Sequence, residues 1–249
     1  MFTEKVQWLR AVPSELISSN EVHVWRLLLN EHNSHVENIK EFLSADELER
    51  AGKFHFEKDQ HRFLMARGVL RIILANYLGK RPDELRFDYN SFGKPALADN
   101  NGWDSISFNL SHSGEIVLYA VSCNRKIGID VERIQDSIDV RQIANRFFSI
   151  AEISSLDRVH KEKMSGVFFQ YWTRKEALFK AVGDGISFPM EHLDVSLING
   201  NLLSPIILPG ENGEKYCWHV QDLFPGDGYT AAIATEGGDL DISCWHYFL

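Results

Sequence analysis

Two long stretches of the chain, residues 61–78 and 167–182, place apolar residues at the three- and four-residue spacing that is typical of a buried helix. A glycine follows each stretch directly (Gly79 and Gly183), and glycine is common just past the end of a helix. The pattern therefore predicts two long helices, one in each half of the chain. Three shorter helices are also predicted: one that begins after Ser44, with Glu47 placed to complete a capping box, one over residues 140–148 and one over 151–160.

Short apolar or alternating runs predict the strands. Residues 127–132, Ile-Gly-Ile-Asp-Val-Glu, alternate strictly, so the β-branched side chains share one face and the two carboxylates share the other. Residues 106–110 and 116–122 predict a pair of strands joined by a short Ser-His-Ser-Gly connection. Further strands are predicted over residues 22–29, 192–198, 202–208, 216–222, 229–235 and 242–247.

The order of these elements occurs twice. In both halves a long helix is followed by a glycine turn, a short strand that carries a leucine (Leu85 and Leu193) and a hairpin. Such a repeat predicts an α+β fold in which two similar halves face each other as a pseudo-dimer, each a small antiparallel sheet packed with a long helix. The predicted domains are residues 1–124 and 125–249.

Composition and charge narrow the class of protein. The chain has 249 residues, of which 44% are hydrophobic and 24% charged, as in globular proteins. Its formal net charge of −9 argues against a broad nucleic-acid surface. No apolar run reaches the roughly 18 residues that a membrane span needs. The first ten residues lack a signal-peptide pattern and the three cysteines lack metal-binding spacing, so we expect a cytoplasmic protein with free thiols.

The two carboxylates on the alternating strand, Asp130 and Glu132, project from the same face, where their charges repel unless water or a cation intervenes. A hard, oxygen-liganded ion such as Mg²⁺ would relieve that repulsion. An exposed strand edge that carries acidic residues is the alternative. The position of the pair within a run of β-branched residues favours a cleft or a solvent layer over an exposed edge.

Glu176 and Lys180 lie four residues apart on the second long helix, so they share one helix face. A surface ion pair is the simplest interpretation of that spacing. Trp172 lies one turn before Glu176 on the same face, however, and a bulky aromatic residue there predicts that the face is partly buried. A buried carboxylate needs a hydrogen-bond partner or a metal ion.

Residues 109–114, Asn-Leu-Ser-His-Ser-Gly, offer several hydrogen-bond donors where a strand meets a turn. Ser111 and His112 could bind an anion, and Gly114 would let a ligand approach the backbone. A turn capped by its own side chains is one alternative, and a Ser-His nucleophile pair is another. Because neighbouring side chains on a strand point apart, the pair is poorly placed for nucleophilic catalysis, which argues against a hydrolase.

In order and spacing, these segments resemble the Sfp-type 4′-phosphopantetheinyl transferases. The segments that carry the resemblance are Phe92-Gly93-Lys94-Pro95, residues 108–113, 127–132 and 172–180, with further agreement at 146–149 and 183–187. The family's fold is a pseudo-dimer of two α+β halves with the active site in the cleft between them. The resemblance implies transfer of the 4′-phosphopantetheine arm of coenzyme A to a serine of a carrier protein, with release of adenosine 3′,5′-bisphosphate.

The resemblance also implies roles for individual residues. The metal ligands would be Asp130, Glu132 and Glu176, which would hold Mg²⁺, or Mn²⁺, against the pyrophosphate of coenzyme A. The catalytic residues would be Glu176 and Lys180. Glu176 would accept the proton of the carrier's serine, directly or through a metal-bound water, and Lys180 would steady the developing charge.

Coenzyme A would be bound by a second group of matching positions, namely Arg50, Gly93, Lys94, Pro95, Ser111, His112 and Lys180. Within that group, Arg50 and His112 match the positions that hold the 3′-phosphate, and the Gly-Lys-Pro segment matches the loop beside the adenine. Two positions depart from some family members: Glu47 replaces a basic residue and Phe63 replaces a polar one, which predicts fewer contacts to the 3′-phosphate. The Trp and Lys-Glu-Ala form of residues 172–177 resembles the subgroup that often acts on fatty-acid and polyketide carriers.

Two other functions fit parts of the pattern. A catalytically silent carrier-binding module would be expected to have lost a metal carboxylate, and all three are present. A different Mg²⁺-dependent phosphotransferase would be expected to carry a Walker or kinase glycine loop, and neither is visible. The expected partners are coenzyme A and apo acyl or peptidyl carrier proteins of fatty-acid, polyketide or non-ribosomal peptide synthesis, without nucleic acid or membrane. The chain is expected to be a monomer. Val140 and Ile143 are the predicted carrier contacts, and packing of both residues into the core of the second half is the alternative.

Overall fold

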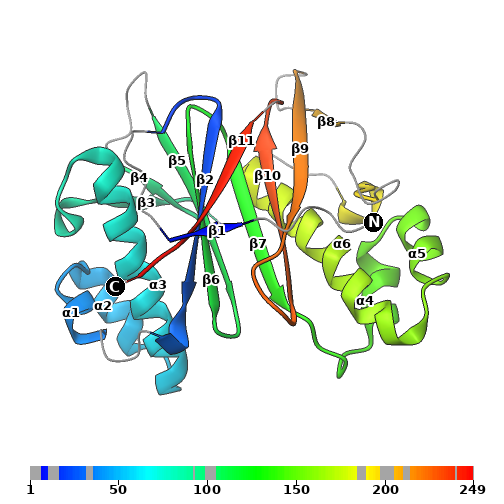
Figure 1. Cartoon of the computed structure of the whole chain (residues 1–249), viewed down its shortest axis with the longest axis horizontal. Coiled ribbons are helices and arrows are strands. Elements are labelled where there is room, and N and C mark those ends of the chain that lie inside the picture. Colours follow the sequence, from blue (N-terminus) through cyan, green and yellow to red (C-terminus); the bar gives the residue numbers. More distant parts are fainter. Residues whose placement is uncertain are drawn as a thin grey trace.

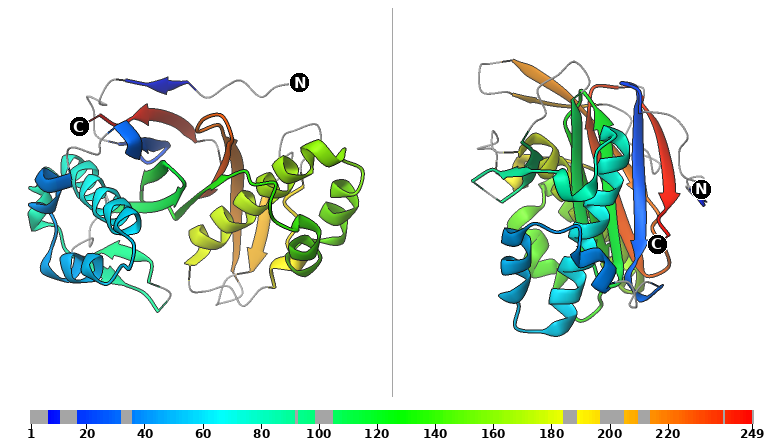
Figure 2. Two further views of the ribbon diagram at one scale, coloured as in Figure 1. Left: turned by 90° about the horizontal axis from the view of Figure 1, so that it is seen from below. Right: turned by 90° about the vertical axis from the view of Figure 1, so that its left-hand side faces the viewer.

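Two β-sheets lie side by side in the middle of the molecule, and helices flank them on both outer sides (Figure 1). The computed structural model describes residues 7–10, 17–31, 36–91, 93–98, 105–183, 189–196, 205–209, 214–238 and 240–248. Seen from below, the two groups of helices lie at opposite ends, with the strands between them (Figure 2). No helix in these ranges is both long enough and apolar enough to cross a membrane.

The first sheet contains five strands and the second contains four. The first has the order β1 (Trp8–Leu9), β11 (Asp241–His246), β2 (Glu21–Leu28), β6 (Ile116–Cys123) and β5 (Ile106–Ser113). The second has the order β7 (Ile127–Arg133), β10 (Tyr229–Glu236), β9 (Lys215–Leu223) and β8 (Ile206–Pro209). A separate two-stranded sheet joins β3 (Phe87–Tyr89) to β4 (Pro95–Leu97).

Each sheet is covered by one long helix and shorter helices. The first group is α1 (Val36–Lys40), α2 (Ala45–Gly52) and α3 (Glu57–Leu78), and the second is α4 (Val140–Phe147), α5 (Ile150–Leu156) and α6 (Lys161–Val182). Short 3-10 helices are η1 (Leu29–Glu31), η3 (Pro82–Glu84) and η5 (Met190–His192). Apolar residues fill the space between α3 and the first sheet, between the two sheets, and between α6 and the second sheet. The predicted α+β fold is confirmed.

A buried ion pair ties the elements of the first half together. Glu47, in the first turn of α2, accepts a hydrogen bond from Nε of Arg71 on α3 at 2.7 Å. The same guanidinium donates to the carbonyls of Pro82 and Leu85, both at 2.9 Å, and so anchors the turn that follows the long helix. A buried charge is stable here because it has both a counter-charge and backbone acceptors.

The second half repeats this arrangement with different residues. Glu152, in the first turn of α5, pairs with Nζ of Lys175 on α6 at 2.9 Å. The ammonium also donates to the carbonyl of Met190 at 2.9 Å and to that of Leu193. Long helix, short capped helix and following turn therefore meet in the same way in both halves. Leu85 and Leu193, which the predicted repeat places in strands, lie in irregular chain after η3 and η5.

Several predicted details are wrong. Residues 111–113 belong to β5, so only the turn at 114–115 connects the hairpin. Residues 192–196 form the end of η5 and irregular chain instead of a strand. The first sheet is not wholly antiparallel, because β11 runs parallel to both β1 and β2. The division at 124/125 stays a prediction, although β11, from the end of the chain, lies in the sheet of the first half.

Candidate active site

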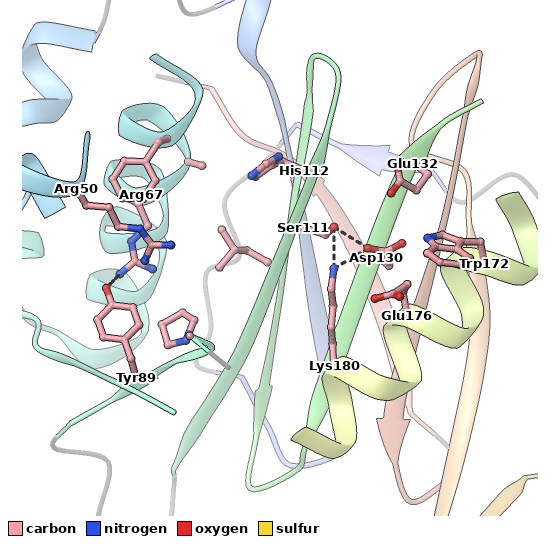
Figure 3. A pocket seen from close by; sticks show the side chains of 15 residues that line it. Arg50, Arg67, Tyr89, Ser111, His112, Asp130, Glu132, Trp172, Glu176 and Lys180 are labelled. Atoms are coloured by element: carbon pink, nitrogen blue, oxygen red, sulfur yellow. Dashed lines mark hydrogen bonds and ion pairs between the residues drawn. The ribbon is translucent and has the colours of Figure 1, made fainter. Parts of the chain in front are cut away.

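A pocket of about 550 Å³ lies where the two halves meet, and its two ends carry opposite charges (Figure 3). One end is basic, and the other, across β5, is acidic. The basic end is formed by Arg50, Arg67 and His112, and the acidic end by Asp130, Glu132 and Glu176. Nine of the ten predicted site residues line this pocket: Arg50, Gly93, Pro95, Ser111, His112, Asp130, Glu132, Glu176 and Lys180.

The acidic end exists because α6 packs directly on β7. Gly128 of β7 makes this possible, since a Cβ atom there would lie 2.1 Å from the carbonyl oxygen of Ala177 and 2.3 Å from the amide nitrogen of Ala181. Asp130 and Glu132 follow on the same strand face, and Glu176 and Lys180 lie on the facing side of the helix. The alternation predicted for residues 127–132 thus places both carboxylates toward α6.

Lys180 and Ser111 hold one oxygen of Asp130. The Lys180 ammonium lies 2.6 Å from Oδ1 of Asp130 and 3.1 Å from the Ser111 hydroxyl, and that hydroxyl donates to the same Oδ1 at 2.9 Å. Asp130 is only 3% exposed. Its other oxygen, Oδ2, is buried and has no hydrogen-bond partner among the residues that the structure describes.

All three carboxyl groups at the acidic end have raised pKa values. Burial raises the pKa of Asp130, against the opposing effect of the Lys180 charge. Burial also raises the pKa of Glu132, and the charge of Asp130 raises it further, while the Ser113 hydroxyl opposes the shift. For Glu176, burial and then the charge of Asp130 raise the pKa, with Lys180 opposing. The three ionised groups therefore destabilise one another at neutral pH.

This donor set fits a hard divalent cation. Within the described ranges, no three His, Cys, Asp or Glu side chains are already gathered as a complete set of metal ligands. The chemistry is nevertheless suitable: Oδ2 of Asp130 is a buried oxygen without a partner, and Glu132 and Glu176 line the same pocket. Oxygen ligands with mutually repelling charges are what Mg²⁺ satisfies.

Replacing Glu176 by Gln is expected to stabilise the metal-free protein at neutral pH. Its folded-state pKa is raised, so the protonated form favours folding below the unfolded pKa of about 4.3, and that advantage is lost as the pH rises through the folded value. At pH 7.5 wild type carries the full cost of the ionised group and Glu176→Gln carries none. We expect a gain of roughly 0.5–2 kcal/mol, measured by thermal unfolding with a chelator present.

The gain of Glu176→Gln should shrink as the pH falls toward 4. Glu162→Gln, at the exposed start of the same helix, is the matched control, and it should give no gain because a negative charge is favourable there. An unfolding temperature of Glu176→Gln equal to or below that of wild type at pH 7.5 would contradict the prediction.

The basic end comes from the first half. Arg50, at the exposed end of α2, stacks over the ring of Phe63, 5.5 Å from its centroid. Arg67 is buried on α3, where it pairs with Glu47 at 2.6 Å and donates to the Tyr89 hydroxyl at 2.7 Å. These groups are preorganised cations on a pocket wall, which suits an anionic ligand group.

His112 faces the pocket from β5, on the opposite side of the strand from Ser111, as predicted for neighbouring strand residues (Figure 3). Surrounding protein atoms displace water from the imidazole, and this desolvation lowers the pKa of His112. The positive charges of Arg62 and Lys180 lower it further. A neutral imidazole can still donate one hydrogen bond to a phosphate. An anion bound at this end would favour its protonation.

Some site predictions are not matched by the pocket. Lys94 is not among its lining residues, since its ammonium donates to the carbonyl of Lys180 near the end of α6 at 2.5 Å. Val140, a predicted carrier contact, is buried in the core of the second half at 7% exposure, so that prediction is wrong. Ile143 packs partly against the same core. Phe92 and residues 184–187 lie outside the described residues.

The structure adds pocket residues that the sequence reasoning missed, and it explains Glu47. Arg67 and Tyr89 line the basic end. A signal for Arg67 was available, because arginines at 67 and 71 interrupt a largely apolar helix and need a buried anion. That anion is Glu47, which is 1% exposed and forms ion pairs with both arginines, so its carboxylate does not face the pocket. Tyr89 gives no comparable signal.

Comparison with known proteins agrees with this geometry. Two family models match consecutive parts of the chain: the N-terminal 4′-phosphopantetheinyl transferase model over residues 30–124 and the 4′-phosphopantetheinyl transferase superfamily model over 126–234. The chain is 38% identical over 240 residues to the 4′-phosphopantetheinyl transferase HetI of Nostoc sp., which covers 96% of this chain and 98% of that protein.

Two further relatives come from distant organisms. The chain is 31% identical over 218 residues to the 4′-phosphopantetheinyl transferase Sfp of Bacillus subtilis, covering 88% of this chain and 92% of Sfp. It is 30% identical over 212 residues to the L-aminoadipate-semialdehyde dehydrogenase-phosphopantetheinyl transferase of Mus musculus, covering 79% of this chain and 68% of the relative. The chain therefore belongs to the 4′-phosphopantetheinyl transferase superfamily.

Proposed function

We propose that this chain transfers the 4′-phosphopantetheine arm of coenzyme A to a serine of an apo acyl or peptidyl carrier protein, in a reaction that depends on Mg²⁺ or Mn²⁺. The observation that carries the proposal is the pocket with opposite charges at its two ends. Coenzyme A is long and has a 3′-phosphate near one end and a pyrophosphate further along. A pocket with cations at one end and carboxylates for a metal ion at the other suits such a molecule.

At the acidic end, Asp130, Glu132 and Glu176 would hold the metal ion, which when bound supplies positive charge to the pyrophosphate. Lys180 adds a second positive charge at the same place, and its ion pair fixes the ammonium 2.6 Å from Oδ1 of Asp130, which leaves Oδ2 for the metal ion. The serine oxygen of the carrier forms a bond to the phosphorus of the pantetheine phosphate. The bond from that phosphorus to the bridging oxygen breaks, and adenosine 3′,5′-bisphosphate leaves.

Glu176 is the group we propose for the proton of the attacking serine. Burial and the charge of Asp130 raise the pKa of Glu176, which makes its carboxylate a stronger base near neutral pH. It lines the pocket one helical turn from Lys180, so the base and the cation act on the same reacting group.

At the basic end, Arg50 and His112 would bind the 3′-phosphate, and Arg67, paired with Glu47, lies on the same wall of the pocket. Gly93 of the β3–β4 loop and Pro95, the first residue of β4, line the pocket, and we place the adenine beside them. The contributions of Lys94 and Ser111 to coenzyme A binding stay predictions.

Arg50→Ala is expected to reduce the preference for coenzyme A over dephospho-coenzyme A by at least about tenfold. A charge-assisted hydrogen bond to phosphate contributes roughly 1.5–3 kcal/mol, and about 1.4 kcal/mol is tenfold in affinity. Calorimetry with both ligands checks the prediction. Lys53→Ala, which removes an exposed cation paired with Glu49 on the same helix end, should keep the wild-type preference. An unchanged preference in Arg50→Ala would contradict the assignment.

The proposed function is tested by incubating the protein with coenzyme A, Mg²⁺ and apo carrier proteins, and weighing the carriers by mass spectrometry. A transferase adds one phosphopantetheine group to the serine of at least one carrier, whereas a catalytically silent carrier-binding module would bind carriers without changing their mass. The intact set of three carboxylates beside Lys180 favours the transferase.

We also propose an oligomeric state, a location and a carrier preference for the enzyme. We infer a monomer, because residues of one chain form both ends of the pocket. A cytoplasmic location is supported by three cysteines that are all free thiols, Cys123, Cys217 and Cys244. The Trp and Lys-Glu-Ala form of residues 172–177 supports a preference for fatty-acid and polyketide carriers.

A further inference from the structure

The two sheets are joined at the pocket by side chains of β5 instead of a strand ladder. β5 and β7 belong to different sheets. Three backbone amides along the free edge of β7 donate to side-chain oxygens of β5, at alternate positions on both strands. The pairs are Ile129 with Asn109 at 2.8 Å, Val131 with Ser111 at 3.4 Å, and Arg133 with Ser113 at 3.1 Å.

The hydroxyl protons of the two serines have one direction open to them. A backbone N–H group and an ammonium group both donate hydrogen bonds and cannot accept them. Ser111 therefore accepts from Val131 and Lys180, and its own proton goes to Asp130 at 2.9 Å. Ser113 likewise accepts from the amide of Arg133, and its proton goes to Oε2 of Glu132 at 2.8 Å (Ser111 and Glu132 are shown in Figure 3).

The β5–β6 turn is fixed in place next to Ser113. Gly114 has φ +55°, and a Cβ atom there would lie 2.3 Å from the hydroxyl oxygen of Tyr229. The next amide, of Glu115, donates to that hydroxyl at 3.1 Å, and the Glu115 carbonyl accepts from Leu29 at 2.9 Å. The strand end that carries Ser113 is thus held by Tyr229 of β10 and by Leu29 of η1, which favours a fixed position for its hydroxyl.

We propose that Ser113 is a positioning residue for Glu132. Its hydroxyl donates to Oε2 of Glu132 and fixes the carboxylate, so that the other oxygen is presented to the cation site. Ser111 holds Asp130 in the same way. There the other oxygen, Oδ2, is buried and has no partner among the described residues. Groups that orient metal ligands in this way typically affect metal affinity by about 10- to 100-fold. The proposal rests on the proposed function, because it takes Glu132 as a metal ligand.

The test is to titrate Mn²⁺ into the full chain at saturating coenzyme A and to measure the Mn²⁺ affinity by calorimetry. We expect Ser113→Ala to bind Mn²⁺ about 10- to 100-fold more weakly than wild type. Ser113→Thr keeps the hydroxyl, and a β-branched residue suits a strand, so it should stay within about threefold of wild type. Ser107→Ala, on the same face of β5 by alternation, is the matched control and should bind Mn²⁺ like wild type.

A folded Ser113→Ala protein whose Mn²⁺ affinity stays within threefold of wild type would overturn the proposal, and a lower unfolding temperature with unchanged affinity would show a structural role instead. If Ser113→Ala does not fold, Ser113→Cys keeps the shape with a weaker donor, and the same affinity criterion applies to it. The carrier mass assay distinguishes failure of this proposal from failure of the proposed function. If wild type modifies a carrier and Ser113→Ala keeps its Mn²⁺ affinity, only the role of Ser113 is overturned. If wild type neither binds Mn²⁺ nor modifies a carrier, the proposed function is overturned as well.

Discussion

Asp130→Ala is expected to lower the rate of phosphopantetheine transfer by about 1000-fold or more while the protein stays folded. Asp130 supplies the one buried side-chain oxygen that has no partner among the described residues, and it also holds the ammonium of Lys180 at 2.6 Å. Removing it takes away a proposed metal ligand and releases the neighbouring cation. Metal-assisted charge stabilisation amounts to several kcal/mol, and about 4 kcal/mol corresponds to roughly 1000-fold in rate.

Two further variants separate loss of the Asp130 charge from a general loss of stability. Asp130→Asn keeps the shape and an acceptor for Ser111 but removes the charge, so similar inactivity would assign the effect to the charge. Asp222→Ala breaks another ion pair between a strand and α6, that of Arg174 with Asp222 at 2.5 Å, away from the pocket. It should lower stability without a comparable loss of transfer below its unfolding temperature. Turnover of Asp130→Ala within tenfold of wild type at saturating Mg²⁺ would contradict the shared site.

Gly128→Ala is expected to cause the largest loss of stability among single methyl additions at the site, at or above the upper end of the roughly 1–3 kcal/mol typical of overpacking. The new Cβ would meet backbone atoms of Ala177 and Ala181 at 2.1 and 2.3 Å, and backbone cannot rotate away as a side chain can. The helix must therefore move from β7. Since Glu176 and Lys180 move with it, transfer should fall as well, by about 100-fold for a displacement of about 1 Å.

Thermal and denaturant unfolding of Gly128→Ala measure the first effect, and the carrier mass assay measures the second. Gly166→Ala is the matched control on α6, where the added methyl group has nothing within 4 Å. It should raise stability by about 1 kcal/mol, because alanine is the better helix former. A stability of Gly128→Ala equal to that of wild type would show that α6 and β7 can separate without cost.

The sequence by itself determined the features that depend on near neighbours along the chain. The alternation of residues 127–132 placed Asp130 and Glu132 on one strand face, and the four-residue spacing placed Glu176 and Lys180 on one helix face. The end of α3 at Gly79 follows from local backbone preference in the same way. These rules act over a few residues, so they hold before any tertiary contact forms.

Only the tertiary structure decided which of these faces meet and with what partners. Ser111 hydrogen-bonds to Asp130 and Lys180, and Lys94 reaches the Lys180 carbonyl, because β5, β7 and α6 converge at one seam. Val140 is buried although its helix has other positions of similar hydrophobicity. Each such contact contributes about 1 kcal/mol, so local pattern cannot rank the alternatives. The choice is made by backbone geometry across the seam, which Gly128 sets by letting the helix touch the strand.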